Sequence, residues 1–154
     1  MFTMIEINVD KIAQEIISGL KATMSLKDRN ATGRTSASLF SEFDSGNMVL
    51  RIMGAEQWQY VEEGRSAGKQ PPLNRIMEWC VARGIPKEAA FPIARKIGQF
   101  GAPKDKTKLN VIADTMKAVE PDILRELDKQ AEASFEATIG QNKIKRNRRH
   151  NEGR

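Results

Sequence analysis

Apolar residues recur at helical spacing from the N-terminus onward. The first such stretch predicts a helix over residues 9–24, and Asn8 is placed to cap its start. A second stretch follows two prolines, Pro71 and Pro72, which fix the backbone for a helix start, and Gly84 ends it. The expected apolar faces of these two helices are Val9, Ile12, Ile16, Ile17 and Leu20, and then Leu73, Ile76, Met77, Cys80 and Val81.

The second half of the chain predicts two further helices. One covers residues 91–100, with Pro92 in its first turn, and Gly101 closes it. The last starts near Pro121 and ends at Gly140. Residues 109–116 fit either a strand or a helical turn. The last helix is expected to be buried along an apolar stripe that consists of Ile123, Leu124, Leu127, Ala131, Phe135 and Ile139.

Two segments, residues 36–43 and 47–53, alternate apolar and polar side chains as strands do. Between them, residues 44–47 read Asp-Ser-Gly-Asn and suit a tight turn, so we expect a β-hairpin. Both faces of this hairpin carry apolar residues, and we expect a neighbour to cover the second face. Residues 57–63 fit a short helix or a turn, and residues 65–70 predict a mobile loop.

Together these elements predict an α+β fold. It comprises an N-terminal helix, a small antiparallel sheet built on the β-hairpin and packed by two to three helices, and a long C-terminal helix. Residues 1–141 are expected to form a single compact domain. Residues 142–154 contain too little apolar surface to pack, and we expect a disordered basic C-terminal tail.

The net charge indicates possible partners only when its distribution along the chain is considered. Of 154 residues, the last twelve contain six basic residues and one acidic residue, which equals the whole net charge of +5. The body of the protein is therefore neutral, and a tendency to bind polyanions is confined to the tail. The candidate polyanion contacts are Lys143, Lys145, Arg146, Arg148 and Arg149.

The side chains that carry catalysis give little support for an enzyme. The single histidine, His150, lies in the tail, so a nucleophilic triad or a histidine metal site is not expected. Cys80 lies on an apolar helix face, where a buried, inert thiol is the usual state. Glu62 and Glu63 are neighbours in sequence and point apart, so Glu62 is expected to accept backbone N–H groups and fix the base of the loop. We expect no enzyme, no cofactor and no metal.

Other features limit the compartment and the partners. No run of about 18 apolar residues exists, so we expect no membrane contact, and the acidic N-terminus does not suit a signal peptide. One cysteine excludes an intrachain disulfide and fits a reducing cytoplasm. Trp58, Tyr60 and Trp79 suit core or interface positions better than a stacking platform for bases. The tail fits a solvated end, an arm that folds on a protein partner, or a nucleic-acid contact.

The order of short motifs between about residues 30 and 101 resembles the tail-completion or neck proteins of tailed bacteriophages, which include head–tail connector and minor tail subunits. Pro92 departs from that pattern, which has a small helix former there, and the basic tail lies outside it. The motifs, in order, are Ala31-Thr32-Gly33-Arg34 before the first strand, Tyr60-Val61-Glu62-Glu63-Gly64-Arg65, the two prolines, Trp79, Gly84-Ile85 and the run from Phe91 to Ile97 with Gly101.

The resemblance implies a virion structural protein without catalytic residues. Such a subunit forms a ring homo-oligomer in the neck or tail, contacts portal-side connector and tail proteins, and resides in the host cytoplasm during assembly. A ring requires two different patches on each subunit. We expect the hairpin and the loop at residues 65–70 to face neighbours, with Tyr60, Glu62, Arg65 and Trp79 as assembly residues. The alternative is a small nucleic-acid-binding accessory protein that acts through its basic tail.

Overall fold

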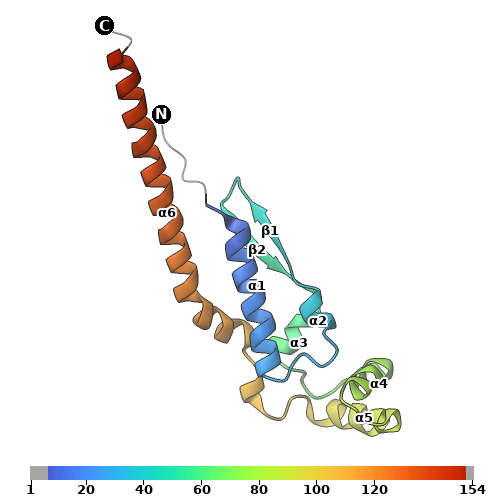
Figure 1. Cartoon of the computed structure of the whole chain (residues 1–154). Coiled ribbons are helices and arrows are strands. Elements are labelled where there is room, and N and C mark those ends of the chain that lie inside the picture. The colour runs from blue at the N-terminus through green and yellow to red at the C-terminus, as the bar shows by residue number, and fades with distance from the viewer. Residues whose placement is uncertain (1–6, 152–154) are drawn as a thin grey trace.

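The computed structural model describes residues 7–151, with side chains described for residues 7–141. Along this part of the chain, the structure consists of α-helices, short 3-10 helices and one two-stranded antiparallel sheet that lies beside α1 (Figure 1), which confirms the predicted α+β class. The elements are α1 (Val9–Leu26), α2 (Arg34–Ala37), β1 (Phe40–Asp44), β2 (Val49–Met53), α3 (Trp58–Glu62), α4 (Leu73–Ala82), η1 (Lys87–Ala89), α5 (Ala90–Phe100), η2 (Lys106–Lys108) and α6 (Val111–Asn151).

The first and last helices, α1 and α6, lie side by side in opposite directions (Figure 1). The predicted cap is confirmed, since the Asn8 side chain accepts a hydrogen bond from the Lys11 backbone N–H at 3.1 Å. The Asn8 backbone N–H donates to the Gln130 side chain at 2.6 Å, and the Lys11 ammonium pairs with the Glu126 carboxylate at 2.7 Å. These contacts set the register between the two helices, because they place the start of α1 beside residues 126–130 of α6.

Near the other end of α1, the two helices approach each other closely at Gly19. A Cβ atom on Gly19 would lie 2.6 Å from Cγ1 of Val119 and 3.0 Å from Cγ2 of Thr115. Thr115 is fully buried, and its hydroxyl lies 2.7 Å both from the Thr23 hydroxyl and from the carbonyl of Val111. The missing side chain at position 19 therefore sets the distance between the helices.

The hydrophobic core is small and lies where α1, α3 and the start of α6 meet. Its buried members are Leu20, Met24, Val61 and Val111. Partly buried residues from the hairpin and its flanks complete the cluster, namely Ile16, Leu39, Ile52 and Trp58.

The predicted hairpin is confirmed, but its first strand begins at Phe40, four residues later than expected. Residues 34–37 form the short helix α2 instead, because the Ser36 hydroxyl donates to the Gly33 carbonyl and to the Asn30 side chain and so stabilises a helical turn. At the hairpin turn, the Asp44 carboxylate accepts backbone N–H groups of residues 46 and 47. Met48 there adopts a left-handed backbone with φ of 53°.

Helices α4 and α5 pack against each other and form an arm at one end of the molecule (Figure 1). The predicted end of α4 is confirmed. Gly84 has φ of 67°. The backbone N–H groups of Gly84 and Ile85 donate hydrogen bonds to the carbonyls of Val81 and Cys80, at 3.1 and 2.8 Å. This is the glycine-terminated helix end that the sequence predicts. Cys80 is fully buried against this pair, as expected.

Helix α6 corrects two predictions, its start and its end. It begins at Val111, so Pro121 lies inside the helix, and residues 109–116, which fit a strand or a helical turn, are largely helical. It runs through Gly140, where a helix end was expected, and its backbone continues to Asn151, within the predicted basic tail. Lysine, arginine and glutamine are good helix formers, and a glycine costs an exposed helix only about 1 kcal/mol, so neither feature terminates it. Residues 152–154 of the expected tail lie outside the described residues.

Candidate assembly surfaces

Glu62, at the end of α3, caps the start of the long helix α6. Its carboxylate accepts the backbone N–H of Ile112 at 2.8 Å, and its backbone carbonyl accepts the N–H of Asn110 at 3.0 Å. A negative charge at this position also favours the positive end of the helix dipole. The Glu62 carboxylate therefore does accept a backbone N–H group, as the sequence predicts, but that group belongs to α6 and not to the neighbouring loop.

Tyr60 and Arg65 are brought together beside this cap. The guanidinium of Arg65 stacks on the Tyr60 ring at 5.0 Å from its centroid, and the Tyr60 carbonyl accepts a hydrogen bond from Arg29 at 2.6 Å. The Tyr60 side chain remains 38% exposed. The pair therefore braces the joint between α3 and the following loop while leaving part of the aromatic ring available to a neighbour.

Residues 65–70 are held at two points, in contrast to the mobile loop predicted for them. Arg65 and Ala102 exchange two backbone hydrogen bonds, of 2.6 and 2.8 Å, and the Gly68 N–H donates to the Gly98 carbonyl at 2.7 Å. Gly101 permits this pairing, because it has φ of 75° and a Cβ there would collide with the Arg65 carbonyl. No local sequence signal indicates this pairing, because Ala102 lies more than thirty residues from Arg65.

Trp79 lies apart from Tyr60, on α4, but the two are linked through neighbouring residues. Arg83 stacks on the Trp79 ring at 5.6 Å and pairs with the Asp28 carboxylate at 2.8 Å. Hydrogen bonds from Arg83, and next from Lys108 at 3.3 Å, hold the pKa of Asp28 below its ordinary value. Asp28 and the following Arg29, which reaches Tyr60, thus connect both aromatic–arginine stacks to the end of α1.

Lys27 and Arg29 are structural residues that the sequence did not single out. The Lys27 ammonium donates to the carbonyls of Thr107 and Leu109, at 3.0 and 2.6 Å, and forms an ion pair with Asp114. Arg29 is partly buried, which lowers its pKa, and its Nε atom is buried without a hydrogen-bond partner. The available signal is a charged run, Lys27-Asp28-Arg29, directly after an amphipathic helix.

Three separate surfaces expose large apolar side chains. On the outer face of the hairpin, Phe40 and Met53 lie opposite each other and are 50% and 40% exposed. Neither face of the two-stranded sheet nor either edge is covered by another strand within residues 7–151. The exposed residues of the arm are Leu73, Val81, Phe91 and Phe100, and those of the distal part of α6 are Leu124, Phe135 and Ile139.

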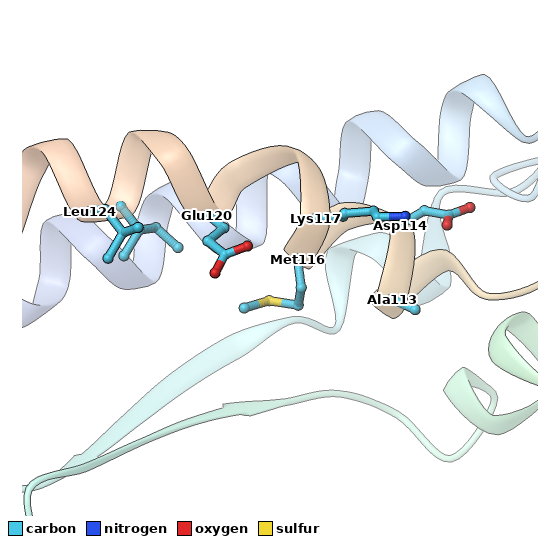
Figure 2. Close-up of a pocket in the computed structure, with 7 residues that line it drawn as sticks. Ala113, Asp114, Met116, Lys117, Glu120 and Leu124 are labelled. Carbon is cyan, nitrogen blue, oxygen red and sulfur yellow. The ribbon is translucent and has the colours of Figure 1, made fainter.

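A shallow hollow of about 500 Å³ runs along one side of α6 (Figure 2). Figure 2 shows Met116, Glu120 and Leu124 along this side of the helix. All of its lining residues come from α6, and they mix apolar side chains with one lysine and two carboxylates. This open, single-helix hollow suits contact with another surface better than it suits enclosure of a small molecule.

The side chains considered for catalysis and metal binding occupy structural positions. Within residues 7–151 no group of three or more His, Cys, Asp or Glu side chains is placed to hold a metal ion. Glu62 is engaged in the helix cap, and Cys80 is fully buried. In the same part of the chain, none of the helices combines the length and the apolar character needed to cross a bilayer.

The candidate polyanion contacts lie on the last turns of α6, where the backbone is described and the side chains are not. These contacts are Lys143, Lys145, Arg146, Arg148 and Arg149.

Comparison with known proteins yields no relatives: no protein-family model, no curated protein and no solved structure matches this chain.

Proposed function

We propose that this protein is a structural assembly subunit, whose role is to bury its apolar surfaces on neighbouring subunits. The observation that carries this proposal is the outer face of the hairpin, where Phe40 and Met53 form an exposed cross-strand pair and Val49 is exposed at the other end of the same face. A small core combined with several large exposed apolar groups is typical of chains that complete their burial on a partner.

Within this class, we propose a ring subunit of a bacteriophage neck or tail-completion complex, located in the virion and partnered by portal-side connector and tail proteins. The order of motifs over residues 30–101 supports this assignment, together with the small α+β fold. The stacked pair of Tyr60 and Arg65 is partly exposed and supports the assignment. The pair of Trp79 and Arg83 supports it in the same way. Glu62 contributes indirectly, because its cap on α6 fixes the joint that presents them.

A closed ring needs two unlike patches on each subunit, and the fold provides them. The outer face of the hairpin lies on β1 and β2, whereas the second apolar surface lies on the α4–α5 arm. Figure 1 shows the hairpin and the arm as separate parts of the molecule. In the proposed ring, the hairpin of one subunit packs on the arm of the next.

The experiment is mass photometry and negative-stain microscopy of the purified chain, alone and mixed with virion extract. The variant Phe40→Glu with Met53→Glu should abolish ring formation, because it places charge in the buried contact. Leu26→Glu is the matched control, since Leu26 is 87% exposed at the end of α1 and should tolerate the change. A chain that stays monomeric and enters no particle, or rings that form equally well with both variants, would refute the proposal.

A second candidate function is nucleic-acid binding by the C-terminal segment. The observation that favours it is that the basic run occupies the end of a helix that extends beyond α1 (Figure 1). Deleting residues 143–154 should remove DNA binding, and the affinity of the full chain should fall steeply with salt. Equal DNA affinity with and without the segment would exclude this role.

A further inference from the structure

The distal half of α6 extends beyond the rest of the fold. Helix α1 begins beside Gln130, and α6 then continues to Asn151, a distance of about 30 Å at 1.5 Å per residue. In Figure 1 none of the other described elements lies beside this part of the helix. An exposed single helix of this length is marginal in water unless an apolar face is covered.

This segment has such a face. Phe135 is 68% exposed and Ile139 is 42% exposed, and the face continues back along α6 to Leu124, which is 54% exposed. At 100° per residue these three positions, with Ala131, fall within about 80° of the helix circumference. The sequence predicts this stripe as a core face, but α1 covers a different side of α6, through Val119 and Glu126.

The charges along the same segment are divided into two halves. Residues 122–136 contain five carboxylates and two basic residues, and residues 143–149 contain five basic residues and no acidic ones. The acidic positions are 122, 126, 128, 132 and 136. Two copies aligned in parallel would place like charges together, whereas two copies aligned antiparallel would place each acidic half against a basic half.

We propose that the distal half of α6 pairs antiparallel with the same segment of a second copy. A two-fold axis near Ala137 sets Phe135 opposite Ile139 of the second copy, and it sets Asp128 opposite Arg146. Positions 128 and 146 are five full helical turns apart, so both fall on the side of the helix that carries Phe135. The overlap runs over residues 123–151, which is about 43 Å of paired helix.

The occupant is a second copy because only an antiparallel copy satisfies both features at once. It covers the apolar stripe of Phe135 and Ile139, and it places the net acidic half of each copy alongside the basic half of the other. Nucleic acid would neutralise the basic half but would leave the stripe exposed beside carboxylates. The contact is isologous and so differs from the heterologous contact that closes a ring. It therefore stands whether or not the protein is part of a virion.

Sedimentation equilibrium of the full chain across a concentration series tests the pairing. Asp128→Arg and Arg146→Asp should each weaken the dimer, and each breaks two pairs per dimer. An exposed pair contributes up to a factor of about five, so the expected weakening is about five- to thirtyfold. The combined variant, Asp128→Arg with Arg146→Asp, exchanges the charges and should restore dimerisation. Circular dichroism checks that all variants keep their helix content.

Directed disulfide formation tests the orientation. A chain with Asp128→Cys and Arg146→Cys should form covalent dimers on oxidation, whereas Asp128→Cys alone should not, because its two copies would lie about 27 Å apart. Cys80 is fully buried, so it should not form disulfides that would interfere with this measurement. Cross-linking by Asp128→Cys alone would indicate a parallel pair and would overturn the proposal. A monomer at all concentrations, or a charge exchange that fails to restore the dimer, would also overturn it.

Discussion

The close approach of α1 and α6 at Gly19 gives a prediction with a calculable sign. An alanine Cβ would lie 2.6 Å from Val119 Cγ1, which is far inside ordinary contact, and Thr115 leaves no space on the other side. Overpacking of this kind costs about 1–3 kcal/mol. Removing a glycine from a helix interior returns about 1 kcal/mol. We therefore expect Gly19→Ala to lower the free energy of unfolding by up to about 2 kcal/mol.

Gly140→Ala is the matched control, because Gly140 also lies inside a helix but an added Cβ meets nothing within 4 Å. That variant should be neutral or more stable by up to about 1 kcal/mol. Urea denaturation followed by circular dichroism and tryptophan fluorescence measures both changes. For a chain of this size, each kcal/mol also shifts Tm by about 2–4 °C.

A double-mutant cycle with Val119→Ala tests the cause. Val119→Ala removes the atom that clashes, so Gly19→Ala should cost less in that background, with a coupling of about 1–3 kcal/mol. The reasoning is refuted if Gly19→Ala changes stability by the same amount as Gly140→Ala, or if the two changes at positions 19 and 119 are additive.

Three further predictions follow from the joint around α3 and the end of α1. Glu62→Ala should lower stability by about 1 kcal/mol in urea denaturation by removing the cap of α6, whereas Glu63→Ala should be nearly neutral; equal losses would contradict the cap. The pKa of Asp28 is lowered in the folded chain, so its contribution is present above its ordinary pKa near 3.8 and is lost as the pH falls below about 4. Asp28→Asn should therefore flatten the acid limb of the urea midpoint plotted against pH, and an unchanged limb would contradict this. Gly101→Ala should lower the thermal midpoint by several degrees, because its Cβ collides with the neighbouring carbonyl at φ of 75°; an unchanged midpoint would show that the loop yields.

The parts of the fold that depend on local signals were predictable from the sequence. Asn8 starts α1, and Gly84 ends α4 at the left-handed position that favours glycine. The hairpin follows from alternation and from the turn at Asp44. In each case the deciding atoms lie within a few residues of one another, so the sequence carries the information locally.

The elements that were mispredicted depend on distant partners. The start of α6 at Val111 is set by the Glu62 carboxylate, some fifty residues earlier in the chain. The loop at residues 65–70 is held by Ala102 and Gly98, which no spacing rule connects to it. The sequence correctly predicts an apolar stripe on α6, but Leu124, Phe135 and Ile139 stay exposed because α1 packs on a different side of the helix, through Val119 and Glu126.

The candidate site likewise contains some residues that the sequence indicates and others that it does not. The sequence singled out Tyr60, Glu62 and Arg65, and the structure brings all three into one joint. It did not single out Arg29 or Asp28, because charged residues after a helix usually face solvent. The proposed assembly role of Tyr60, Glu62, Arg65 and Trp79 stays a prediction, for which the ring-formation experiment above provides the test.

The antiparallel pairing of α1 with α6 has a consequence for synthesis of the chain. Asn8 and its partner Gln130 are 122 residues apart in sequence. At about 5–20 residues per second, the ribosome needs about 6–24 s to make the second after the first. During that interval, the face of α1 that carries Gly19 and Thr23 lacks the helix that later covers it. The nascent chain therefore emerges with this face of its first helix uncovered, and α1 can complete its packing only after residues 115–130 have been synthesised.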